Sequence, residues 1–271
     1  MEKSRLLIIT HELDPYVAIT EIANTVSKIP LRLHDEELEI RVLMPRFSTI
    51  NERRHRLHEV VRLSGINIEV DGEDYPLIIK VAALPGARLQ VYFLDNEDLF
   101  WDRNIYCDED GDFHDENLNR MVFFCQGALE TVIKFGWPPK YIQCHGWMTS
   151  VIPALLKTQY ADNPVFADAQ LMYTAYPNEM AGSIAEDFAE QFLEDTALTE
   201  EDLAPYGSGS EEDLHKGAIF YADHIALTKG VDESVVKASK DSKKPVVEIE
   251  KAEEAEEVFA QFYVSREEEN V

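Results

Sequence analysis

Two polar side chains stand directly after segments with the apolar pattern of buried strands. Glu12 follows the apolar run at residues 6–9, and His145 follows the run at residues 141–144. An α/β sheet places its ligand-binding groups at the carboxyl ends of its strands, so these two could contact a substrate, with His145 as the candidate catalytic residue. A solvated loop is the alternative for Glu12, and a structural histidine is the alternative for His145.

A second polar group opens a long expected helix. Asn117 and Arg120, with Glu116 before them, could donate or accept hydrogen bonds with a polar ligand, although an acidic residue favoured by the helix macrodipole explains this start almost as well. An unrelated α/β enzyme could use Glu12, His145 and Glu116 together. These residues lack the nucleophile and base pairing that covalent catalysis needs, so this hypothesis ranks last.

Metal and cofactor chemistry finds little support in the sequence. The acidic run at residues 108–112 invites a calcium reading, but an EF-hand loop would need Gly at Phe113 and Glu at Asn119. The three cysteines show no C-x-x-C spacing, which argues against a zinc ribbon and a disulfide framework. We therefore predict no metal and no cofactor.

The elements that must position these residues alternate between strand and helix. The first 50 residues predict a strand, a helix that Pro30 kinks or ends, and a second strand, which is the βαβ unit of a parallel sheet. An Asp-Gly pair at residues 71–72 predicts a β-hairpin flap. Further strands are expected at residues 89–94, 141–144, 171–174 and 224–227, and further helices at 117–134, 149–157, 214–221 and 231–238.

The predicted fold is an α/β domain over residues 1–238 with a charged, helical tail at 239–271. Residues 183–214 carry eleven carboxylates and no lysine or arginine, which predicts a mobile or helical surface insertion outside the core. The tail places Ala255, Phe259 and Tyr263 on one side of an expected amphipathic helix.

Composition narrows the class of protein. The chain has 52 acidic and 25 basic residues, a formal net charge of −27, which disfavours nucleic-acid and membrane partners. No apolar run reaches the length of about 18 residues that a membrane span needs. We expect a soluble, cytoplasmic protein.

Connecting motifs along the chain resemble the N-terminal half of bacterial glycogen and starch synthases. The segment VYFLDNEDLF at residues 91–100 is similar to the family's V-Y-F-I-D-N-x-x-Y-F, and HGWMT at 145–149 is similar to H-D-W-H-T. Matches in the same order include THELDPY at 10–16, VLMPRFSTI at 42–50, the start of the helix at 116–124, GWP at 136–138 and KGAIFYAD at 216–223.

This resemblance implies a Rossmann-like domain, one half of the GT-B glycosyltransferase architecture. Family activity is retaining glucosyl transfer from ADP-glucose to an α-1,4-glucan, with the donor held mainly by a C-terminal domain. We expect that donor domain to be missing here, because too few residues follow 238. The resemblance marks Glu12, Asn117, Arg120, His145, Trp147 and Thr149 as candidate substrate-binding residues. For Trp147, core packing at a helix start is the stronger alternative.

The chain departs from the family at several positions expected to face phosphate or sugar. The family's K-x-G-G-L is AITEI at residues 18–22, which removes a cation and adds a carboxylate. In H-D-W-H-T, Gly146 replaces Asp and Met148 replaces the second His. The family's H-N is Tyr-Pro at residues 176–177, and its S-P-T is Thr-Lys-Gly at 228–230.

Two functional hypotheses follow. The favoured one is a catalytically degenerate family member that binds a glucan, a metabolite such as ADP-glucose, or a protein, with a partner or a homodimer at the face that the expected missing half would leave. The alternative is an ADP-glucose:α-1,4-glucan glucosyltransferase subunit that needs a separate donor-binding partner.

Overall fold

A computed structural model describes residues 3–33, 38–87, 89–101, 105–107, 110–178, 180, 183–184 and 188–269 of the chain. Its framework is one sheet with the strand order β10-β9-β8-β7-β1-β2-β6-β5-β3, and β4 pairs with β5 beside this path. Neighbours from β10 to β6 are parallel, whereas β5 is antiparallel to β6. This confirms the predicted α/β class.

The parallel strands are short apolar runs, most of them buried on both faces as expected when helices cover a sheet on each side. They are β1 (Ser4–Thr10), β2 (Leu38–Pro45), β6 (Gln90–Asp95), β7 (Tyr141–His145), β8 (Gln170–Ala175), β9 (His224–Thr228) and β10 (Val246–Ile249). Only β10 was not predicted. It is an edge strand in which Ile249 alone is buried, so its sequence lacks the apolar run of the others.

The predicted hairpin consists of β4 (Ile66–Val70) and β5 (Glu73–Ala83). Asp71 and Gly72 both have positive φ, 52° and 69°, as the two-residue turn requires. β5 also pairs with β6 and with the short β3 (His58–Glu59). The hairpin therefore extends the main sheet and is not a separate flap.

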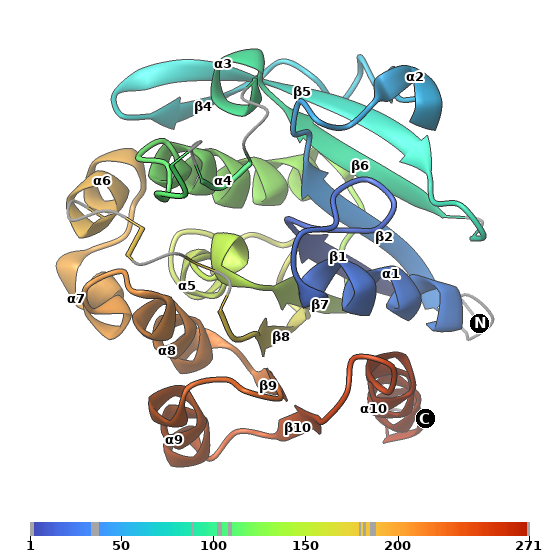
Figure 1. The fold of residues 1–271 in the computed structure, drawn as a ribbon, viewed down its shortest axis with the longest axis vertical. Coiled ribbons are helices and arrows are strands. Elements are labelled where there is room, and N and C mark those ends of the chain that lie inside the picture. The colour runs from blue at the N-terminus through green and yellow to red at the C-terminus, as the bar shows by residue number, and fades with distance from the viewer. Residues whose placement is uncertain are drawn as a thin grey trace.

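Helices lie on both faces of the sheet (Figure 1). On one face α10 (Ala255–Glu269) packs beside α1 (Glu21–Leu33), which continues through Pro30 without ending there. On the other face lie α4 (Asn117–Phe135), α5 (Ile152–Lys157) and α8 (Glu211–Tyr221). The short α2 (Glu52–His55), α3 (Glu97–Phe100) and 3-10 helix η1 (Trp147–Thr149) fill loops.

The acidic segment differs from the expectation of a surface insertion. It forms α6 (Phe188–Asp195), α7 (Glu200–Leu203), the 3-10 helix η2 (Ala204–Tyr206) and the start of α8. Phe188, Phe192, Leu203 and Tyr206 are buried in the hydrophobic core, and the Tyr206 hydroxyl donates to the Ser150 carbonyl at 2.9 Å. The sequence did not reveal this apolar pattern because carboxylates dominate the segment. They lie on the outer faces of the helices, while the inner faces pack in the hydrophobic core.

The helix expected at 231–238 is α9 (Glu233–Ser242), and the tail that follows adds the strand β10 to the sheet and the helix α10 on one of its faces. Phe259 and Tyr263 of α10 are buried, and the Tyr263 hydroxyl donates to Gln143 Oε1 of β7 at 3.0 Å. Arg32 of α1 pairs with Glu257 of α10 at 2.9 Å. The predicted amphipathic tail thus covers the sheet face to which Gln143 points. No helix in the described ranges is long and apolar enough to cross a membrane.

Candidate functional site

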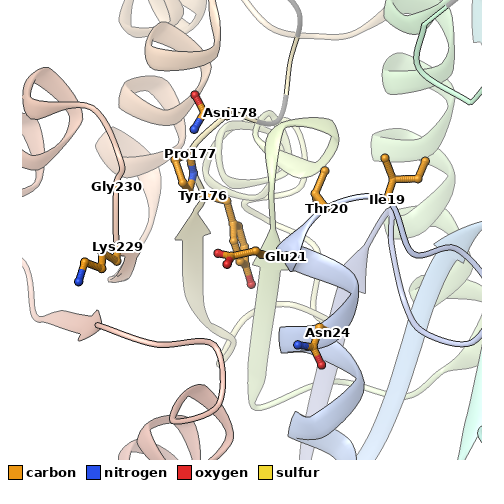
Figure 2. Close-up of a pocket in the computed structure, with 9 residues that line it drawn as sticks. All are labelled: Ile19, Thr20, Glu21, Asn24, Tyr176, Pro177, Asn178, Lys229 and Gly230. Carbon is orange, nitrogen blue, oxygen red and sulfur yellow. The ribbon is translucent and has the colours of Figure 1, made fainter.

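A cavity of about 740 Å³ opens at the carboxyl edge of the sheet, where the loops after β1, β8 and β9 meet (Figure 2). This is the edge at which parallel α/β sheets bind ligands. Its lining comes from the start of α1 and from the two later loops: Ile19, Thr20, Glu21, Asn24, Tyr176, Pro177, Asn178, Lys229 and Gly230.

The loop before α1 is anchored by Glu12. Its Oε2 accepts hydrogen bonds from the backbone N–H groups of Ile19 and Thr20, both at 2.8 Å, and its Oε1 accepts from the Thr20 hydroxyl at 3.1 Å. Burial raises the pKa of Glu12, and these donated hydrogen bonds oppose the rise. Free backbone N–H groups near the start of a helix ordinarily attract anions. Here the carboxyl group of Glu12 already accepts the hydrogen bonds of two such groups.

The first turn of α1 presents polar groups to the cavity. Glu21 and Asn24 are exposed, one turn apart. On the opposite wall, Lys229 pairs with Glu250 at 3.8 Å, and both side chains are largely exposed. Ile19, which is 55% exposed, gives the cavity an apolar rim.

Tyr176 links the cavity to His145. The Tyr176 hydroxyl shares a hydrogen bond of 2.8 Å with His145 Nδ1. His145 is fully buried, and burial, with a smaller contribution from nearby His11, lowers its pKa to about 3. Its Nε2 has no hydrogen-bond partner among the described residues. The imidazole is therefore neutral at physiological pH and lies beneath the cavity floor.

Asn117 and Arg120 are both buried and hold the loop that follows α3. Arg120 donates to the carbonyls of Leu99 and Ile105 at 2.7 and 2.9 Å. Asn117 donates to the Tyr106 carbonyl at 2.8 Å. These contacts are to backbone groups of the chain itself, and neither side chain lines the cavity.

Trp147 and Thr149 also lie in the core. The Trp147 ring packs against His11 and Phe113 with centroid distances of 5.5 and 5.2 Å. The Thr149 hydroxyl donates to the Gly146 carbonyl at 2.9 Å, within the turn that starts η1.

The six predicted substrate-binding residues are thus buried in the fold, and none lines the cavity. Glu12, Trp147 and His145 gather around His11, whereas Asn117 and Arg120 hold a separate loop. Their ligand-binding roles stay predictions.

The sequence analysis did not single out Asn24 or Asn178, which do line the cavity. The sequence did contain a signal for each of them: Asn24 lies one turn into the first expected helix, and Asn178 follows shortly after an expected strand.

Metal ligands are not grouped in the part of the chain that the structure describes: no three His, Cys, Asp or Glu side chains there could hold an ion. Asp108 and Glu109 of the considered calcium loop lie outside the described residues. The cavity therefore offers polar and charged side chains for a hydrogen-bonding ligand.

The fold and this edge cavity define an α/β domain with a cavity at the carboxyl ends of its parallel strands, and comparison with known proteins gives the family. The starch synthase catalytic domain matches residues 5–229, so the chain belongs to that family.

The chain is 38% identical over 173 residues to a glycogen synthase of Chlorobium limicola, a match that covers 64% of this chain and 35% of that protein. It is 31% identical over 225 residues to a glycogen synthase of Chlorobaculum tepidum, covering 83% and 45%. The chain thus spans less than half the length of these curated relatives.

A solved structure shares the fold. The catalytic domain of Starch Synthase IV from Arabidopsis thaliana, bound to ADP and acarbose, superposes with a TM-score of 0.72. The match covers 91% of this chain and 51% of that one at 19% identity, a likeness of fold alone.

Proposed function

We propose that this chain is a starch synthase family domain that has lost the donor-phosphate site and uses the edge cavity to bind a carbohydrate of the α-glucan class. One observation carries the proposal. Glu21 places an exposed carboxylate at the cavity, at a position where the family motif has glycine. Its negative charge at the start of α1 repels a diphosphate.

The departures from the family motif act in the same direction. Where the family has K-x-G-G-L, Ala18 removes the cation, and Thr20 and Glu21 put side chains where glycines would let a phosphate approach the backbone. The altered positions 176–177 and 229–230 line the same cavity.

The remaining surface suits a sugar ring. The exposed apolar side chain of Ile19 offers a surface for the C–H face of a ring, while Asn24 and Asn178 offer amides for hydroxyl groups. An apolar wall with a few placed polar groups is the usual composition of a small-molecule site.

The alternative is a glucosyltransferase subunit that transfers glucose from ADP-glucose with a separate donor-binding partner. Its support is that the relatives are glycogen synthases and that the structural neighbour binds ADP and acarbose. Binding of another metabolite or of a protein at the cavity is a further outcome.

Affinity electrophoresis in gels that contain glycogen tests the proposal. We expect glycogen to retard the wild-type protein, Asn24→Ala to reduce the retardation, and Asp168→Asn, an exposed change at the opposite edge of the sheet, to leave it unchanged. Equal mobility with and without glycogen would overturn glucan binding.

Incorporation of glucose from ADP-[14C]glucose into glycogen separates the alternative. The proposal expects no incorporation by the pure protein above a no-protein blank, and none that depends on the protein when cell extract is added. Incorporation that rises with added protein in extract would favour the subunit.

A further inference from the structure

We propose that the edge cavity selects saccharides that carry a protonated amine, with Glu21 as the counter-ion of that amine. This inference rests on the proposed function, because it states that, among glucose-based carbohydrates, the same cavity prefers those in which an amine replaces a hydroxyl group. Glu21 is the first residue of α1, and Figure 2 shows its side chain extending from α1 towards the loop after β9.

Glu21 is available to a ligand. It is exposed, and no cation among the described residues forms an ion pair with it. A carboxylate with open coordination at a cavity wall is satisfied by donors from water or from a ligand, and a charged donor makes the stronger hydrogen bond.

The cation on the other wall does not cancel this charge. Lys229 has Glu250 as its own partner at 3.8 Å. In Figure 2 the Lys229 side chain extends away from Glu21. The charges of Lys229 and Glu250 offset each other, which leaves Glu21 as the unbalanced charge of the wall formed by α1.

The surroundings of the cavity disfavour an anion and favour a cation. An anion in the cavity would meet the carboxylate of Glu21, and the N–H groups of Ile19 and Thr20 already donate to Glu12. The net charge of −27 adds a long-range field that concentrates cations near the surface.

An amine alone would not use the rest of the cavity. Asn24 and Asn178 can bind hydroxyl groups, and Ile19 can pack against the C–H face of a ring. A sugar that carries an ammonium group matches all three features at once, whereas a phosphorylated sugar would bring its charge to Glu21.

The test titrates ¹⁵N-labelled protein with methyl α-D-glucoside and with its 2-amino and 6-amino deoxy analogues, and NMR shifts give the dissociation constants. We expect at least one amino analogue to bind about fivefold more tightly than the neutral glucoside, the upper end for an exposed ion pair. Glu21→Gln should abolish this ratio, and added salt should reduce it.

Glu200→Gln, an exposed glutamate at the first position of α7, is the matched control and should keep the ratio. Equal affinity for neutral and amino sugars, or a preference that persists in Glu21→Gln, overturns this inference and leaves the proposed function standing. If none of the sugars binds, the inference fails, and the glycogen gel decides separately whether the proposed function stands.

Discussion

The residues that match the family and those that depart from it lie in different environments. Glu12, Arg120, His145 and Trp147 match and are buried, and their observed contacts are with the chain itself. Of the departing positions, 20–21, 176–177 and 229–230 line the open cavity, whereas Gly146 and Met148 lie in the buried region. The matching residues here hold the fold, whereas most of the changed positions face the cavity without loss of the fold.

The buried region should be sensitive to truncation and the cavity should not. Trp147→Ala removes a fully buried ring from a cluster of aromatic side chains, so we expect a loss of about 3–5 kcal/mol in the free energy of unfolding. Urea denaturation followed by circular dichroism measures it. A loss below about 1 kcal/mol would show that the ring is not part of a tightly packed core.

Buried histidines make the same region sensitive to acid. Burial lowers the pKa of His11 and His145 to about 3 and that of His215 to about 4. The unfolded chain takes up these protons below about pH 6.5 while the folded protein does not, so stability is complete above that pH and falls as the pH falls. We expect each of the three histidines to lower the free energy of unfolding by about 2 kcal/mol at pH 5 relative to pH 8.

Replacement of one histidine, His145→Asn, should make the loss of stability between pH 8 and pH 5 smaller by about 2 kcal/mol. Urea unfolding at pH 8, 6 and 5 measures it, with the exposed His58→Asn as control. A pH dependence identical in wild type and His145→Asn would mean that His145 titrates alike in the folded and unfolded states.

Gly146 differs from the Asp of the family motif although it lies in the buried region. Its φ of 76° and ψ of 177° belong to a conformation that almost only glycine adopts, so the family's Asp would be strained here. We expect Gly146→Asp to destabilise the protein by about 1–3 kcal/mol. Gly146→Ala separates the causes: an equal loss assigns the cost to the backbone, and an unchanged stability excludes strain.

Cavity residues should show the smallest effect. Glu21→Gln and Ile19→Ala change exposed side chains without buried partners, so the free energy of unfolding should stay within about 0.5 kcal/mol of wild type. Thermal and urea unfolding measure it. A loss above about 2 kcal/mol for either variant would remove the contrast between the two regions.

The sequence predicted the elements better than the roles of side chains. Apolar runs gave β1, β7, β8 and β9, because strands buried on both faces need uniform apolar character. β10 was missed because edge strands lack that character. For α6 and α7 the sequence allowed helices but missed their burial in the core, because carboxylates dominate their composition.

For the site, residue type did not show whether a side chain faces a ligand or its own chain. Glu12 and Arg120 have polar types suited to a substrate, but their partners are backbone amides and carbonyls that only the folded loops bring near. The edge at which the cavity opens was predictable from the carboxyl ends of the expected parallel strands, and most of the positions that depart from the family line the cavity.

Titration calorimetry with ADP tests the central claim most directly, that the changes at Ala18, Thr20 and Glu21 have removed a phosphate site. The comparison is between wild type and the variant Ala18→Lys, Thr20→Gly, Glu21→Gly, which restores the family motif. We predict no saturable heat for wild type and measurable binding for the variant. Saturable ADP binding by wild type as tight as that of the variant would contradict the account.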